Sequence, residues 1–584
     1  MPSRFKHSFL ALSFCFTASL TSFIAIAEQE TREPEAGTGI YQQHLVTAQK
    51  YMVSAAHPLA VMAGQNILAK GGSAVDAAIA TQLMLGLVEP QSSGLGGGAF
   101  MLYWQSSNQQ LTSFDGREKA PAAATDKLFF DHDKVMDWRE AYVGGKSVGV
   151  PGVVAMMEKA HQQFGKLAWA DLFTDTINTA INGFAVSSRT ASQLEKGWNK
   201  GIAQFAQSRQ YFYPHGQVVK QGDTLTNPAY AKTLEVIASK GAAGFYSGEI
   251  AQEIANTVQN AKINPGQLQL SDLANYQTVQ REPVCMLYRL YKVCGMAPPS
   301  SGGIAVMQIL GMLEQYDLAK VAPDSVQATH LISQAAKLAF ADRELYMADP
   351  DFVAVPVNGM IDRQYLAQRG KLIPSHKAGV KAQAGSPALA PAVAASEAIE
   401  FPNTSHLSIV DAQGNAVSMT TSIENVFGSG LMVAGFLLNN QLTDFSLQPT
   451  VNGQMVANKV QGNKRPRSSM APMMVFDQHN NLVLVIGSPG GSRIINYVAQ
   501  TIIAVLDWRM NMLEAIALPK FTHRNDYLAL EKDTALQQQQ AALEKMGYKV
   551  QLQDLNSGLH GIMITEQGLQ GAADPRREGR AAGK

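Results

Sequence analysis

Four residues, Asn403-Thr404-Ser405-His406, place a hydroxyl directly before an apolar strand pattern, "HLSIV". A threonine hydroxyl in this position can attack the carbonyl of the preceding residue, converting the peptide bond to an ester that water then cuts. The new chain end carries an α-amine beside its own hydroxyl, and this amine, with an ordinary pKa of about 7.7–8.0, can act as a general base. Thr404 is therefore a candidate N-terminal nucleophile, released by cleavage between Asn403 and Thr404.

Two plainer interpretations of Thr404 stay open at this point. Asn403, Thr404 and Ser405 also match the N-glycosylation sequon. A threonine at the start of a strand is common in any sheet protein, and the four residues alone do not decide among these interpretations.

Two further segments contain groups that could assist acyl transfer. Gly490 and Gly491, in "GSPGGSR", precede a helical pattern, where exposed backbone N–H groups could stabilise an oxyanion. A plain turn is the alternative. Ser468 and Ser469 pair two hydroxyls after a basic run in "KRPRSSMAP", which on its own is typical of a solvated loop.

The elements around these residues predict a layered α/β protein. Apolar spacing favours helices within residues 55–88, where Ser73 can cap the second helix, and over much of residues 150–270. Residues 376–400 are rich in Ala, Pro, Ser and Gly and are typical of an exposed linker. After them, the hairpin "HLSIV"–"DAQGN"–"AVSMTTSI" leads to further strands and then to the helix "SRIINYVAQTIIAVLDW".

Composition and charge exclude several classes of function. The 584 residues are 46% hydrophobic and include 47 basic and 47 acidic residues, so the formal charge is zero and we expect no nucleic-acid partner. Residues 1–27 have a positive start, an apolar middle and an Ala-Ile-Ala end, which predicts a signal peptide. We therefore expect an exported protein, periplasmic or secreted, with no membrane anchor after removal of the signal.

The remaining motifs concern cysteine and metal chemistry. Cys285 and Cys294 would face each other across a hairpin that turns at Arg289-Leu290, as a disulfide or as two buried thiols. The 12 histidines are scattered, and neither HExxH nor CxxC occurs. We expect no metal and no cofactor.

A set of segments, in one order along the chain, resembles the γ-glutamyltransferase (glutathione hydrolase) family of the N-terminal-nucleophile hydrolase superfamily. These segments are "AAHPLAVMAGQNILAKGGSAVDAAIA", "EPQSSGLGGGAFML", "FDGREKAP", "SVGVPG", "PPSSGGI", "ADRELYMADPDF", "NTSH", "LLNNQLTDFS", "KRPRSSMAP", "GSPGGSRI" and "ADPRREGRAAGK". The resemblance implies an α/β (α+β) fold, a four-layer αββα sandwich of the N-terminal-nucleophile hydrolase type. It also implies a precursor that cuts itself into a large subunit, 28–403, and a small catalytic subunit, 404–584, which stay together as a heterodimer.

The same resemblance assigns roles to individual residues. Thr404 would be the nucleophile, assisted by the Ser422 hydroxyl, and Gly490 and Gly491 would stabilise the oxyanion. The substrates would be γ-glutamyl compounds such as glutathione, and the acceptor would be water, an amino acid or a peptide. The residues implied in binding the γ-glutamyl group are Arg117, Ser468 and Ser469 for its carboxylate, and Asp444, with Gln441 beside it, for its ammonium group.

Two departures from the family pattern concern the substrate site. Much of the family has Thr-x-Asn where this chain has Ser422-Ile423-Glu424, so Glu424 replaces a neutral amide and is expected to alter a substrate-binding position. Some members carry a lid with a tyrosine, whereas residues 444–468 of this chain contain none.

Two other functions are compatible with parts of this pattern. A cephalosporin- or glutaryl-acylase-like amidase of the same fold would share Thr404 and the glycines but would have less use for Asp444 as an ammonium ligand. An exported solute-binding protein for glutamyl compounds would not cleave itself.

Overall fold

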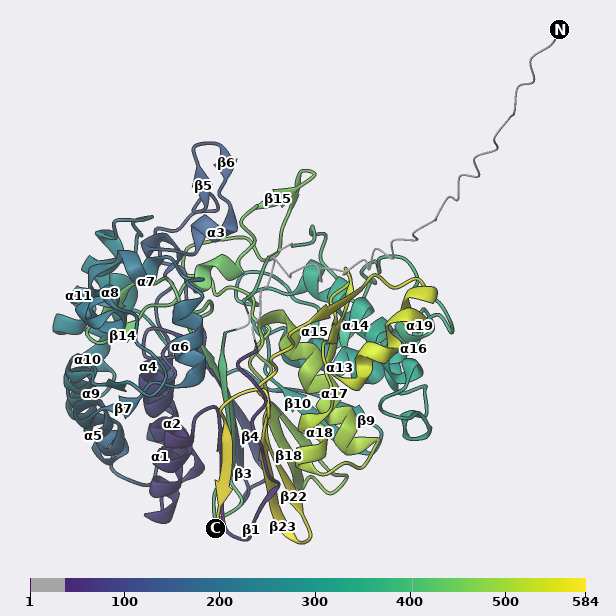
Figure 1. The fold of residues 1–584 in the computed structure, drawn as a ribbon, viewed down its shortest axis with the longest axis horizontal. Coiled ribbons are helices and arrows are strands. Elements are labelled where there is room, and N and C mark those ends of the chain that lie inside the picture. Colours follow the sequence, from purple (N-terminus) through teal and green to yellow (C-terminus); the bar gives the residue numbers. More distant parts are fainter. Residues whose placement is uncertain (2–36, 397, 402) are drawn as a thin grey trace.

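Two β-sheets stacked face to face form the middle of the protein, and helices cover both outer faces (Figure 1). The computed structural model describes residue 1 and residues 37–584, apart from residues 397 and 402. One sheet has six strands, in the order β24 (Arg580–Gly583), β2 (Met52–Ala55), β11 (Ser405–Val410), β12 (Ala416–Ser422), β3 (Gly98–Gln105) and β4 (Gln110–Gly116).

The second sheet has seven strands, and like the first it is antiparallel throughout. Its order is β1 (Val46–Ala48), β23 (Gly568–Ala573), β22 (His560–Thr565), β18 (Leu482–Gly487), β17 (Met473–Phe476), β10 (Tyr291–Gly295) and β9 (Val284–Tyr288). Each sheet combines strands from before and after residue 404.

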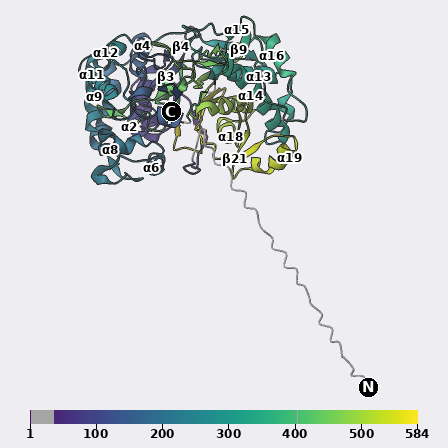
Figure 2. The ribbon, with the colours of Figure 1, turned by 90° about the horizontal axis from the view of Figure 1, so that it is seen from above.

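Helices pack on the outer face of each sheet. Helices α1 (Pro58–Ala69) and α2 (Ala74–Val88) lie on the six-stranded sheet, and α13 (Gly302–Leu313), α14 (Val326–Tyr346) and α17 (Ile494–Leu506) lie on the other side. Seen from above, α9 (Pro228–Lys240) and α11 (Gly248–Gln259) are at one end, and α14 and α16 (Arg363–Gly370) are at the opposite end (Figure 2). The predicted four-layer αββα sandwich is confirmed.

The helix predictions are confirmed where apolar spacing was strongest. Ser73 caps α2 through a reciprocal pair of hydrogen bonds with Asp76, the arrangement that satisfies two N–H groups at a helix start. Nearly every residue of α2 is buried, because the helix packs between the sheet and an outer group of helices that includes α4 (Val153–Phe164) and α9.

The predicted hairpin at Arg289-Leu290 is also confirmed. Strands β9 and β10 pair with Cys285 opposite Cys294, and the two residues form a disulfide with a Cα–Cα distance of 4.1 Å. Of the two alternatives, a disulfide and two free thiols, the structure therefore has the disulfide.

The linker prediction for residues 376–400 was only half right. The described residues of this segment form no helix or strand, apart from a single bridge between Ala394 and Val456. However, its end is not exposed, because Ser396 and Glu400 are 2% and 4% exposed. Absence of periodicity predicted irregular backbone correctly, but it did not predict that this backbone enters the protein interior.

Two predictions concern the chain's relation to membranes. The predicted signal peptide, residues 1–27, lies outside the described part of the chain except for Met1. Among the helices that are described, none combines the length and apolar character needed to span a bilayer.

Candidate active site

Thr404 lies immediately before β11, which is flanked by β2 and β12 within the six-stranded sheet. The residue is 3% exposed. Its hydroxyl donates a hydrogen bond to Ser422 Oγ at 3.3 Å, and Ser422 Oγ in turn donates to the carbonyl oxygen of Asn403 at 3.0 Å. The backbone N–H of Glu424 donates to Ser422 Oγ at 2.8 Å, which fixes the orientation of this hydroxyl. Ser422 thus links the Thr404 hydroxyl to the carbonyl that it would attack.

Three residues that the sequence analysis did not single out hold the Asn403–Thr404 peptide in place. The side-chain oxygen of Asn403 accepts hydrogen bonds from Arg189 and Gln193, each at 3.3 Å. The Arg577 guanidinium donates to the carbonyl oxygen of Thr404 at 3.4 Å. Arg577 lies in the segment "ADPRREGRAAGK", whose family resemblance was the available signal, whereas Arg189 and Gln193 lie on α6 (Ser188–Glu195) and had none.

A small cavity of about 20 Å³ brings most of the predicted site residues together. A space of this size holds little more than one water molecule. Gly490 is not among the residues that line it, although Gly491 is. The predicted residues that do line the cavity are Arg117, Thr404, Ser422, Glu424, Gln441, Asp444, Ser468, Ser469 and Gly491.

The predicted carboxylate ligand, Arg117, and the predicted ammonium ligand, Asp444, are paired with each other. Both are buried, and Arg117 Nη2 donates to Asp444 Oδ2 and to the carbonyl oxygen of Arg467, the latter at 2.8 Å. Burial raises the pKa of Asp444 to about 7, although the Arg117 charge opposes this shift. Arg117, which is 1% exposed, is thus held by a buried carboxylate and not by an ion pair on the surface.

Glu424 has the left-handed backbone angle φ of +79°, which a residue with a side chain adopts at an energetic cost of about 1–3 kcal/mol. Its carboxyl accepts hydrogen bonds from the Phe401 N–H at 2.8 Å and from the Asn440 side-chain amide. Burial and the neighbouring Asp444 raise the pKa of Glu424 well above its usual range. The departure from the family pattern therefore puts a second carboxyl group next to Asp444.

Two acceptor atoms in the cavity have no hydrogen-bond donor among the described residues. These atoms are Gln441 Oε1 and Asp444 Oδ1, and both are buried. Buried oxygens without a donor are costly, so this end of the cavity favours a ligand group with several N–H donors.

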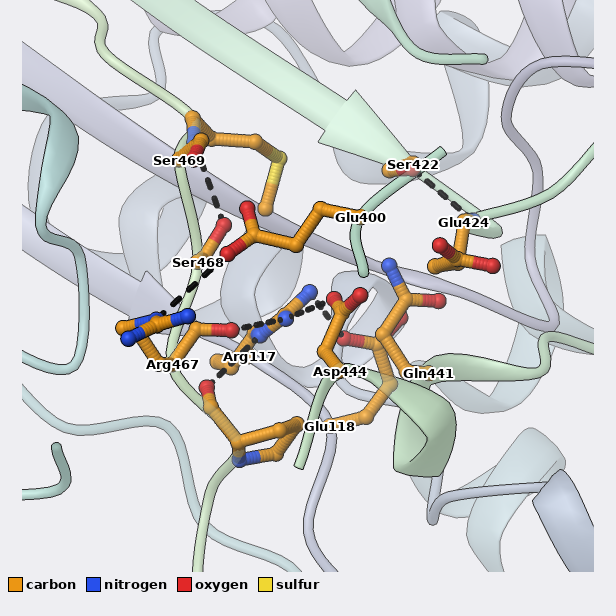
Figure 3. Close-up of polar contacts among 12 residues, drawn as sticks. Arg117, Glu118, Glu400, Ser422, Glu424, Gln441, Asp444, Arg467, Ser468 and Ser469 are labelled. Atoms are coloured by element: carbon orange, nitrogen blue, oxygen red, sulfur yellow. Dashed lines mark hydrogen bonds and ion pairs between the residues drawn. The ribbon is translucent and has the colours of Figure 1, made fainter. Parts of the chain in front are cut away.

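The paired hydroxyls of Ser468 and Ser469 are buried and are not part of a solvated loop. Figure 3 shows the carboxylate of Glu400 reaching toward them. Arg343 binds this carboxylate and also donates to Ser469 Oγ at 2.6 Å, and Arg467 Nε lies 3.5 Å from it. Burial raises the pKa of Glu400, but the two guanidinium groups outweigh this effect and lower it to about 2.

Glu400 and Phe401 occupy the space in front of the candidate oxyanion site. Gly491 has φ of +55°, and a Cβ atom there would lie 2.5 Å from the Phe401 carbonyl oxygen and 2.7 Å from the Glu400 carbonyl oxygen. We call Glu400 and Phe401 the blocking residues. The sequence analysis missed them because Glu400 ends, and Phe401 follows, the segment whose composition predicted a linker.

Comparisons with known proteins agree with this geometry. The sequence model of the Gamma-glutamyltranspeptidase family matches residues 60–584. The glutathione hydrolase proenzyme of Escherichia coli (strain K12) is 38% identical over 549 residues, 91% of this chain and 91% of that protein. The glutathione hydrolase proenzyme of Bacillus subtilis (strain 168) is 35% identical and covers 97% of this chain and 98% of its own length.

The fold also matches solved structures. Cephalosporin acylase from Bacillus halodurans has a TM-score of 0.82 at 25% identity, over 94% of this chain and 99% of that one. The family match extends from helix α1 to the last residue and includes every predicted site residue. This chain therefore belongs to the gamma-glutamyltranspeptidase family of enzymes.

Proposed function

We propose that the protein is an exported, self-cleaving γ-glutamyl hydrolase and transferase whose nucleophile is Thr404. The observation that carries the proposal is the hydrogen-bonded series from the Thr404 hydroxyl through Ser422 to the Asn403 carbonyl. It joins a nucleophile, a proton-transferring group and an electrophile within one buried site.

Self-cleavage uses this series directly. The Thr404 oxygen attacks the Asn403 carbonyl carbon, while Ser422 takes the Thr404 proton and gives its own to the carbonyl oxygen. Collapse of the tetrahedral intermediate breaks the C–N bond while the proton on its oxygen passes to the nitrogen, and leaves a neutral Thr404 amine and an Asn403 ester. Water then hydrolyses the ester to an Asn403 carboxylate and a free Thr404 hydroxyl.

Turnover repeats the same chemistry on a substrate. The α-amine of Thr404 removes the hydroxyl proton, and the oxygen attacks the γ-carbonyl of the donor, with Gly490 and Gly491 N–H groups stabilising the oxyanion. The leaving amine takes the proton, and a γ-glutamyl ester remains on Thr404. Water, or the amine of an amino acid or peptide, then attacks this ester and restores the enzyme.

The two charged ends of a γ-glutamyl group account for the charges in the cavity. Asp444 Oδ1 and Gln441 Oε1 would accept from the α-ammonium. Arg117, Ser468 and Ser469 would hold the α-carboxylate, which replaces the Glu400 carboxylate once the blocking residues leave. No donor fits while they stay, because the free space is about 20 Å³.

The proposed products of cleavage are a large subunit, 28–403, and a small subunit, 404–584, after loss of the signal peptide, 1–27. Strand β11 of the small subunit pairs with β2 of the large one, and β24 pairs with β2 on its other edge. Because both sheets contain strands from both subunits, the cut chains would stay together as a heterodimer in the periplasm or outside the cell.

An amidase of the cephalosporin- or glutaryl-acylase type is the alternative. Its support is the similarity to a cephalosporin acylase structure, together with Glu424 and the absence of tyrosine from residues 444–468. Glutaryl donors lack the α-ammonium, so they have no group for Asp444 to bind.

Replacement of Thr404 tests the nucleophile. Thr404→Ala is expected to remain one intact chain, because no hydroxyl is left to attack Asn403, whereas the wild type gives two chains, the smaller starting at Thr404. A denaturing gel with intact-mass measurement reads this out, and Thr404→Ser should still cut. An uncut wild-type chain after long incubation would overturn the proposal.

Removal of the Ser422 hydroxyl tests the proton-transfer series. Ser422→Ala is expected to slow self-cleavage roughly 100-fold, the size of effect seen when one transition-state donor is lost. Ser418→Ala in the same strand is the matched control, since Ser418 Oγ donates to the Ile486 carbonyl and does not touch the cleavage site. Equal cleavage rates for the two variants, from gel time courses, would exclude Ser422 from the mechanism.

Asp444 distinguishes the two candidate activities. Asp444→Asn is expected to lower kcat/KM at least tenfold more for γ-glutamyl-p-nitroanilide than for glutaryl-p-nitroanilide, because only the first donor has an ammonium that needs the carboxylate. The ratio of the two losses is the measurement, since Arg117 loses its partner with either donor. Equal losses would remove Asp444 from ammonium binding.

Because the blocking residues fill the glutamyl site, we expect that the uncut protein does not bind glutamate, the product of hydrolysis. Isothermal titration with glutamate should give binding to the cut wild type and none to the Thr404→Ala precursor, in which Glu400 keeps its place beside Ser469. Equal affinity of the two forms would show that Glu400 does not occupy the glutamyl site.

A further inference from the structure

A second, larger cavity of about 1180 Å³ lies beside Asn403, next to the predicted cleavage site. Asn403 and Asn425 form part of its wall, and Phe401 lines both this cavity and the small one that holds the predicted donor residues. Phe401 is therefore the partition between the two spaces. When the blocking residues leave, the small cavity opens into the large one next to Thr404.

The wall nearest this partition is aromatic. The Phe401 ring centroid lies 4.6 Å from that of Trp138 and 5.7 Å from that of Tyr142, at tilted and edge-on angles that aromatic pairs favour. Trp138 begins helix α3 (Trp138–Ala141), just after the β5 (Phe130–Asp131)–β6 (Lys134–Val135) hairpin that stands at the rim of the molecule (Figure 1). The Arg139 guanidinium covers the Trp138 ring at 5.4 Å from its centroid.

Two aromatic side chains of this wall, Tyr142 and Phe401, are buried. Tyr142 is 7% exposed, and its hydroxyl donates to the Trp198 carbonyl oxygen at 2.9 Å, which fixes the ring in place. Phe401 is 6% exposed, so its ring is almost fully enclosed. Its departure would leave an aromatic slot of the size of a phenyl ring, in the wall of the large cavity onto which the small cavity would then open.

The charges around the cavity do not select an anion or a cation. Basic and acidic side chains both line it, among them Lys146, Lys200, Asp137 and Glu140. The choice of ligand therefore depends on the aromatic rings of Trp138 and Tyr142, which pack favourably against another aromatic ring.

We propose that the slot vacated by Phe401, between Trp138 and Tyr142, binds an aromatic group on the leaving amine of the donor and on the incoming acceptor amine. In the uncut chain, Phe401 occupies the place of this aromatic group, and Glu400 occupies the place of the glutamyl group. The inference rests on the proposed function, because it assumes that Thr404 is acylated from the small cavity.

The test compares two γ-glutamyl donors of similar size on the cut enzyme. γ-Glutamyl-phenylalanine should have a kcat/KM roughly threefold to tenfold above that of γ-glutamyl-cyclohexylalanine, whose saturated ring cannot make aromatic contacts. Trp138→Leu should bring this ratio close to one, and Trp138→Phe should largely keep it.

Trp508→Leu is the matched control. Trp508 is also half-buried, but it follows α17, does not line the cavity, and donates its Nε1–H to the Leu318 carbonyl oxygen at 2.9 Å. It should keep the wild-type ratio. A wild-type ratio of one, or a raised ratio that survives Trp138→Leu, overturns the aromatic slot. Hydrolysis of neither donor instead overturns the proposed function itself.

Discussion

The position of one hydroxyl, Ser422 Oγ, determines what the rest of the site can do. It accepts from Thr404 and from the Glu424 N–H and donates to the Asn403 carbonyl, so all three hydrogen bonds must be satisfied together. This is possible because Ser422 ends β12, which pairs with β11 in the register Ser405–Thr421 and so lies beside Thr404. The sheet thus supplies the rigidity that aligned reacting groups require.

Buried charge is the second organising feature. The precursor keeps each ion of the site neutralised internally, with Asp444 on Arg117 and with Glu400 on Arg343. When Glu400 leaves, the buried guanidinium of Arg343 keeps its ion pair with Glu344 at 2.6 Å, but its Nη2 loses its carboxylate partner. Because Arg343 and Arg467 then share only the Glu344 carboxylate, the site favours an incoming carboxylate. The precursor therefore shapes the charge balance of the site that its own cleavage would open.

The sequence predicted which residues meet at the site better than it predicted what closes the site. Thr404, Arg117 and Asp444 could be found because they lie in segments with a family resemblance, and the structure brings them to one cavity. Glu400 could not, because an aperiodic, Ala- and Pro-rich stretch carries no signal of burial. Its partner Arg343 lies 57 residues away on α14, and only the packed tertiary structure joins them.

The same limit explains the residues found only in the structure. The hydrogen bond between Arg189 and Asn403 spans 214 positions of the sequence, and no local pattern encodes such a contact. Residue propensity likewise does not predict that Glu424 adopts a left-handed backbone conformation. Among residues other than glycine, asparagine adopts this conformation more often than glutamate does. Local sequence signals are reliable for elements such as α2, where periodicity and a capping box coincide.

The pairing of β2 with β24 has a consequence for timing. These strands lie near opposite ends of the chain, with Met52 opposite Gly583, and β2 also borders β11. The sheet that aligns Thr404 therefore cannot be completed until β24 has been synthesised. A truncated or stalled chain would lack both β24 and the Arg577 contact to Thr404. Under the proposed self-cleavage, the cut would therefore follow the docking of β24, and a cut chain would report that this strand had been made and folded.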